Sequence, residues 1–140
     1  MALVQVKDAE GSVLDWMVAK CEGWEWKTGV STWYGNKPWF ELFLGDIPWG
    51  NGTFRSVNRC RPLELRYSTD WEKGGPIIER EKIELIPPKD EDDNEWMAVW
   101  YKCEDAEAGI QVGTSPIIAA MRCYVSSVLG DEVEVPDELI

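Results

Sequence analysis

The 140-residue chain is 44% hydrophobic, enough to form the core of one globular domain over residues 1–140. Its formal net charge of −12 argues against long DNA or RNA as a partner, because affinity for the phosphate backbone depends on Lys and Arg. The chain has no histidine, no C-x-x-C pair and no apolar run of about 18 residues, so we expect an intracellular protein with reduced thiols, no metal, no cofactor and no membrane contact.

The first helix is predicted over residues 8–22, after a short edge strand or frayed terminus at residues 1–6. Leu14, Met17, Val18 and Cys21 recur at steps of three and four residues, and Gly23 supplies a stop. Residues 24–34 are aromatic and β-branched, which favours short strands or ordered loops. Residues 35–58 are rich in Gly and Trp, which favours an irregular segment used for binding or as an interface.

The middle of the chain is predicted to contain two strands separated by a sharp turn. Residues 63–67 alternate between apolar and polar, as a strand does. Gly74, Gly75 and Pro76 then favour a bend over a helix. Residues 77–86 favour a second strand, and the acidic run at residues 90–93 indicates a solvated loop.

The last third is predicted to supply a central strand and a second helix. Residues 96–101 are apolar at every position, which indicates a strand in the middle of a sheet or covered on both faces. Ser115 or Thr114 caps a helix over residues 116–129, with Pro116 at its first position. The acidic residues 131–138 read as a solvated tail. Together these elements predict an α+β fold with two helices on the apolar face of a mostly antiparallel sheet.

A candidate ligand site surrounds the predicted turn, where hydroxyls, a carboxylate and an indole precede the paired glycines. We include the second helix's N-terminus, because its free N–H groups attract anions, and one arginine beyond the turn. The plainer alternatives are an ordinary turn and an ordinary helix cap. The candidate residues are Tyr67, Ser68, Thr69, Asp70, Trp71, Gly74, Gly75, Arg80, Thr114 and Ser115.

Two further patterns leave alternatives open. Arginines at positions 59, 61, 66 and 80 either hold an anion or form ion pairs with nearby acids such as Glu79 and Glu81. Catalytic motifs are absent, because the sequence holds no histidine base and no phosphate-binding glycine loop. Asp70 and Glu79 are the best carboxylate candidates, but we expect no enzyme.

Three segments resemble the NinX family of small phage proteins, found in tailed phages and prophages of enterobacteria. They are LDWMVAKCEG at residues 14–23, YSTDWEKGGPIIERE at residues 67–81, and GTSPIIAAMRCYV from residue 113, continuing to LGDEV at residues 129–133. The resemblance implies a phage-encoded accessory protein in the cytoplasm of the infected bacterium. It supplies no activity and no catalytic residues.

Three functional hypotheses follow. The leading one is a non-enzymatic protein that sequesters a small, anionic, nucleotide-like host immune signal, with its ring on Trp71 or Tyr67 and its charge at Arg80. The second is a module that inhibits a host enzyme through an acidic, Trp-rich surface, and the third is a nucleotide-degrading enzyme. Nine Trp residues also favour a homo-oligomer, because exposed aromatic area tends to be covered by another subunit.

Overall fold

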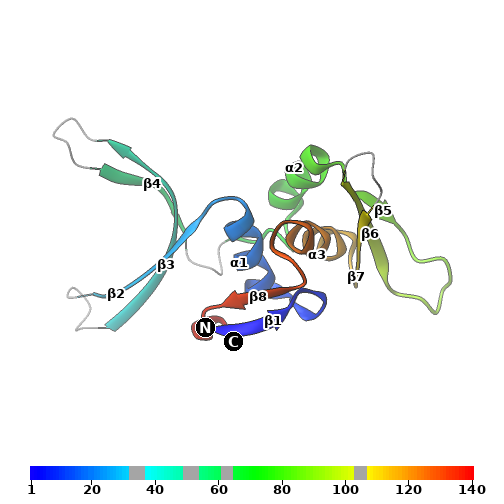
Figure 1. The fold of residues 1–140 in the computed structure, drawn as a ribbon, viewed down its shortest axis with the longest axis horizontal. Coiled ribbons are helices and arrows are strands. Elements are labelled where there is room, and N and C mark those ends of the chain that lie inside the picture. Colours follow the sequence, from blue (N-terminus) through cyan, green and yellow to red (C-terminus); the bar gives the residue numbers. More distant parts are fainter. Residues whose placement is uncertain (32–36, 49–53, 61–64, 103–106) are drawn as a thin grey trace.

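The structure, a computed structural model, describes residues 1–31, 37–48, 54–60, 65–102 and 107–140. Figure 1 shows helices and strands mixed along the chain, as in an α+β fold. The helices are α1 (Gly11–Cys21), α2 (Trp71–Glu81) and α3 (Pro116–Leu129), with short 3-10 turns η1 (Val6–Asp8) and η4 (Asp137–Leu139). The strands are β1 (Ala2–Gln5), β2 (Glu25–Ser31), β3 (Lys37–Pro48), β4 (Phe54–Cys60), β5 (Glu84–Ile86), β6 (Trp96–Lys102), β7 (Glu107–Gly113) and β8 (Glu132–Val135).

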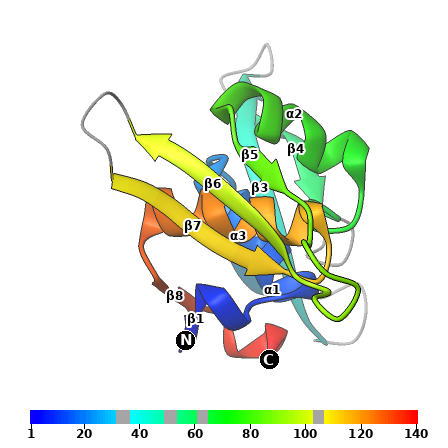
Figure 2. The same ribbon diagram turned by 90° about the vertical axis from the view of Figure 1, so that its right-hand side faces the viewer.

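All strand pairs among the described residues are antiparallel, in three sheets of order β1-β8, β2-β3-β4 and β5-β6-β7. The β5-β6-β7 sheet lies against α3, which crosses behind it in Figure 2. Strand β6 is the middle strand of that sheet, as predicted. The predicted α+β class is confirmed, with three helices among the described residues where two were expected.

Glycines in β7 allow α3 to approach the sheet closely. A Cβ on Gly109 would lie 2.8 Å from the Ser127 Oγ, and one on Gly113 would lie 2.7 Å from the Ala119 nitrogen. The Arg122 guanidinium of α3 donates to the carbonyl oxygens of Val112 and Ala9, both at 2.8 Å. These contacts fix the face of the sheet that α3 covers.

The hydrophobic core lies between α1, α3, the β5-β6-β7 sheet and the β1-β8 pair. Leu14 and Met17 of α1 and Met121 and Val125 of α3 are all fully buried. Helix α1 therefore uses the apolar face that its sequence periodicity predicts, although it begins at Gly11, three residues later than expected.

The predicted turn at residues 74–76 is wrong, because these residues lie inside α2. Asp70 caps the helix by accepting the Glu72 N–H at 2.9 Å, and the Gly74 N–H donates to the Asp70 carbonyl oxygen, also at 2.9 Å. Most of the strand expected over residues 77–86 is also helical, and only β5 remains of it. Lys82, in the left-handed region at φ 55°, ends the helix.

Two further sequence predictions need correction. The acidic residues after α3 form β8 instead of a solvated tail, because Val133 and Val135 alternate with exposed glutamates and are buried beside β1. Residues 35–58, expected to be irregular, contain most of the regular β2-β3-β4 sheet, which stands apart from the helices in Figure 1. Residues 65–67 do not continue a strand, and the rest of that predicted strand lies outside the described residues.

Candidate functional site

Ser68, a predicted ligand contact, is buried and anchors its loop to α1. It is 1% exposed, and its backbone N–H donates to the Asp15 Oδ1 at 2.8 Å. Burial raises the pKa of Asp15, and the hydrogen bonds from Ser68 only partly oppose this effect. The Asp15–Ser68 contact therefore belongs to the buried part of the protein.

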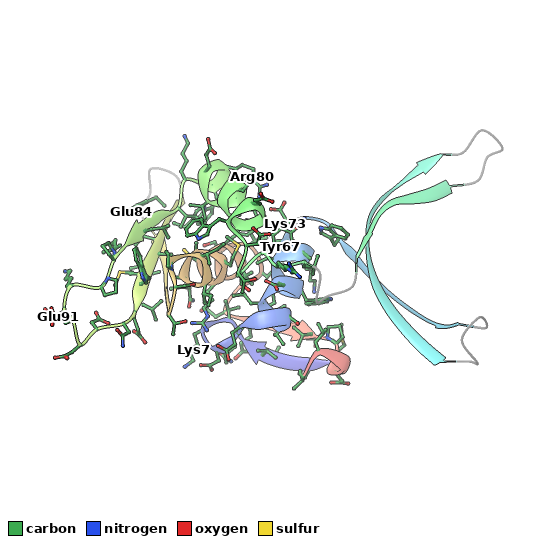
Figure 3. All side chains as sticks on the ribbon, turned by 180° about the vertical axis from the view of Figure 1, so that it is seen from behind. Lys7, Tyr67, Lys73, Arg80, Glu84 and Glu91 are labelled. Carbon is green, nitrogen blue, oxygen red and sulfur yellow. The ribbon has the colours of Figure 1, made fainter. Side chains whose placement is uncertain are left out.

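Tyr67 is held at the end of α1 by a tryptophan that sequence reasoning did not include. The Trp24 Nε1 donates to the Tyr67 hydroxyl at 3.2 Å, and both side chains are partly buried. Figure 3 shows Tyr67 and Lys73 on the side of the molecule that faces the β2-β3-β4 sheet. The polar residues around the predicted turn are thus divided between the core and the side of the molecule that faces the β2-β3-β4 sheet.

The N-terminus of α2 presents an indole to solvent. Trp71, its first residue, is 51% exposed, and Thr69 and Lys73 are exposed as well. The carboxylate of Asp70 already occupies the helix end as its cap. Because an anion stabilises a helix N-terminus, this internal carboxylate fills the position at the start of α2 where an external anion could otherwise bind.

The second predicted helix end lies close to α2. Ser115 caps α3 by accepting the Ile118 N–H at 3.2 Å, whereas Thr114 is exposed. A Cβ on Gly74 would lie 2.7 Å from the Ile117 Cδ1, so α2 meets α3 two residues beyond Ser115. A Cβ on Gly75, the next residue, would meet only the Trp71 ring, at 4.0 Å. The structure thus brings Gly74 close to the first turn of α3.

The guanidinium of Arg80 forms hydrogen bonds with side chains of the same chain. Its guanidinium donates to both carboxylate oxygens of Glu22, at 2.7 and 3.3 Å, to Glu81 at 3.0 Å and to the Tyr124 hydroxyl at 3.1 Å. The hydrogen bonds that Arg80 donates to Glu22 and then to Glu81 raise the pKa of Arg80, and burial raises the pKa of Tyr124 to about 12. For Arg80, the structure shows the ion-pair alternative.

Arg80 and Trp71 also lie too far apart to share a small ligand. They are nine positions apart in α2, and at about 1.5 Å per residue they differ by about 14 Å along the helix axis. The same spacing separates the carboxylate candidates Asp70 and Glu79, which cannot flank one reacting bond at that distance.

An open hollow of about 420 Å³ lies elsewhere, between η1, β7 and the start of β8. None of the predicted site residues line it. Its walls are Gln5, Lys7, Ile110, Gln111 and Asp131.

The outward-facing surface of the β5-β6-β7 sheet is apolar, a feature that sequence reasoning did not turn into a site. Met97 is 37% exposed, Ile110 55% and Tyr101 61%. The Tyr101 hydroxyl donates to Glu84 at 2.7 Å, and this bond raises the Tyr101 pKa. The signal was present, because residues 96–101 are apolar at every position. The outer sheet face, as we call it, consists of Glu84, Ile86, Met97, Val99, Tyr101, Ile110 and Val112.

Within the described ranges, no three His, Cys, Asp or Glu side chains are grouped so as to hold a metal ion. Helices of these same ranges are too short or too polar to span a membrane. No curated protein matches the chain. The family model described as "Bacteriophage P22, NinX" matches residues 5–127, so the chain belongs to the bacteriophage P22 NinX family.

Proposed function

We propose that this NinX-family protein is a non-enzymatic phage accessory protein that acts by binding other proteins in the cytoplasm of the infected bacterium. The outer sheet face carries this proposal. Antiparallel sheets with one solvated face normally place polar side chains there, whereas this face exposes Met97, Tyr101 and Ile110. Exposed apolar patches on soluble proteins mark interaction sites.

Covering this face with another protein would be favourable in free energy. Removing the exposed half of a large apolar side chain from water contributes about 1 kcal/mol, so Met97, Tyr101 and Ile110 together offer about 3 kcal/mol. The distance between Asp70 and Glu79 supports binding over catalysis, because these two carboxylate candidates cannot act together on one reacting bond.

Affinity capture from lysate of the bacterial host tests the proposal. The wild-type protein should retain a partner in stoichiometric amount, and Ile110→Glu should lose it, because the new carboxylate would be buried in the contact. Val128→Glu is the matched control, since Val128 is 51% exposed on α3, away from the outer sheet face. Equal capture by wild type and Ile110→Glu would refute this role for the face.

A nucleotide-like ligand remains a second candidate because of Trp71. This indole is half exposed at the N-terminus of α2, where Thr69 and Lys73 are also exposed, and an exposed indole offers a flat surface on which a base can stack. Sequestration of a host immune signal would follow from such binding. A thermal shift with added nucleotides that disappears in Trp71→Ala would support it, whereas no shift with the wild-type protein would argue against it.

A further inference from the structure

We propose that the protein bound by the outer sheet face is a basic one, whose contact surface has an apolar centre bordered by lysines or arginines. The acidic loop, as we call residues 87–95 between β5 and β6, attracts this partner. The inference rests on the proposed function, because it takes the outer sheet face to be a protein contact. It adds the chemical class of the partner.

The acidic loop begins and ends at the outer sheet face. It joins the end of β5 to the start of β6, and Ile86 and Met97 on either side of it are paired directly across the two strands. Figure 1 shows the loop leaving the sheet on the side away from α3, and Figure 3 shows Glu91 at its outer end. A protein that covers Met97 therefore also meets the acidic loop.

The charge of this loop is strongly negative, at −4 from five acids against the single base Lys89. The five acids are all exposed, and they are Asp90, Glu91, Asp92, Asp93 and Glu95. Ion pairs within the described residues involve other side chains, and no group of acids there is arranged to hold a metal ion. Like charge repels nucleic acid, an anionic lipid surface and a second copy of this chain, whereas lysines and arginines are attracted.

Hydrogen bonds within the acidic loop hold its backbone in a turn. The Asp93 N–H donates to the Asp90 carbonyl oxygen at 3.1 Å, and the Glu95 N–H donates to the Asp93 Oδ1, also at 3.1 Å. The acids therefore extend from a backbone that already has a defined shape. A partner that binds them loses less conformational entropy than it would by ordering a free chain.

The apolar part of the face is too small to hold a protein by itself. Val99 is only 5% exposed, so the accessible apolar surface comes mainly from Met97, Tyr101 and Ile110. The exposed halves of three large side chains amount to roughly 300 Å², whereas each partner in a stable complex buries about 800 Å². The acidic loop enlarges the contact and adds attraction, so the affinity should depend on salt.

Fluorescence anisotropy with a labelled peptide tests the inference. The probe is a short helical peptide whose leucines form one face and whose other positions are lysine, and a second peptide carries glutamate in place of lysine. The wild-type protein should bind the lysine peptide and not the glutamate peptide. Its affinity should fall severalfold between about 50 and about 500 mM salt, because salt screens exposed charges.

Variants separate the acidic loop from the overall charge of the chain. The double variant Glu91→Gln/Asp92→Asn should bind the lysine peptide about three- to tenfold more weakly, because exposed ion pairs each contribute little. The matched control Glu134→Gln/Asp137→Asn removes the same charge near the chain ends, away from the acidic loop in Figure 1, and should match wild type. Ile110→Ser, which removes apolar surface without adding charge, should also weaken binding severalfold.

A wild-type protein that fails to bind the lysine peptide, or that binds both peptides equally, would overturn the inference. So would unchanged affinity in the loop variant or in Ile110→Ser, or an equal loss in the matched control, once circular dichroism shows each variant folded. The proposed function has a separate outcome. If the captured host protein is lost by Ile110→Glu but kept by Glu91→Gln/Asp92→Asn, the face binds a protein that the acidic loop does not attract.

Discussion

Gly74 and Gly75 are neighbours in α2, and we expect alanine to have opposite effects at the two positions. Both lie in the helix interior, where replacing glycine by alanine contributes about 0.8–1.0 kcal/mol through helix propensity. Their surroundings differ. A Cβ on Gly74 would lie 2.6 Å from the Tyr67 carbonyl oxygen and 2.7 Å from the Ile117 side chain, whereas one on Gly75 would meet only the Trp71 ring, at 4.0 Å.

Those distances set the expected magnitudes. Gly75→Ala should stabilise the protein by about 0.5–1 kcal/mol, because it gains helix propensity without a clash. At Gly74 the same gain is opposed by overpacking of about 1–3 kcal/mol, and the Tyr67 carbonyl oxygen can move only if the backbone moves. Gly74→Ala should therefore lower the free energy of unfolding by up to about 2 kcal/mol.

Urea unfolding followed by tryptophan fluorescence measures both changes, and the expected order of stability is Gly75→Ala, wild type, Gly74→Ala. Two results would refute the reasoning. If both variants are destabilised by more than about 1 kcal/mol, the two glycines adopt a turn that alanine cannot enter, and α2 is not helical there. If both are stabilised equally, α2 does not pack on Tyr67 and Ile117.

Three further predictions concern charged and thiol groups. Because burial raises the pKa of Asp15, its contribution to stability is present below the ordinary value of 3.8 and is lost as pH rises through the raised value. Asp15→Asn keeps an oxygen that accepts the backbone N–H of its partner. The free energy of unfolding of this variant should therefore exceed that of wild type between about pH 4 and pH 7. Arg80→Ala and Glu22→Ala should each cost only about 0.5–1 kcal/mol in urea unfolding, since Arg80 is half exposed, and the double variant should lose little more than either. Burial raises the pKa of Cys21 to about 12 and that of Cys123 to about 11, so peptide mass spectrometry should find both unalkylated by iodoacetamide until urea is added.

The elements predicted correctly from sequence are those with strong local signals. Helix α3 begins with a serine cap and a proline at its first position, and its apolar residues keep helical spacing to Leu129. The uninterrupted apolar run of β6 likewise indicated the middle of a sheet. In such cases the residues that determine the element are neighbours in sequence.

Helix α2 was not predicted because the conformation of its glycines depends on tertiary packing, which the local sequence does not show. A Gly-Gly-Pro sequence locally favours a bend, but Gly74 is the residue that lets α2 lie against Ile117, and Asp70 supplies the cap that starts the helix. Strand β8 was missed for a related reason. Its glutamates suggested a solvated tail, and only pairing with β1 shows that its valines are buried.

The error over α2 explains why the internal partners of Arg80 were not predicted. In an extended loop, Trp71 and Arg80 could fold toward one ligand, but in a helix nine residues make about two and a half turns and place them on opposite faces. Arg80 then meets Glu22 and Tyr124, which are distant in sequence and so were invisible as partners. The apolar pattern of β6 was visible, yet a sequence alone cannot say whether its second face is covered by the same chain. On this second face Val99 is buried, whereas Met97, Tyr101 and Ile110 are exposed, so burial within the chain explains only part of the pattern and the proposed protein contact would account for the rest.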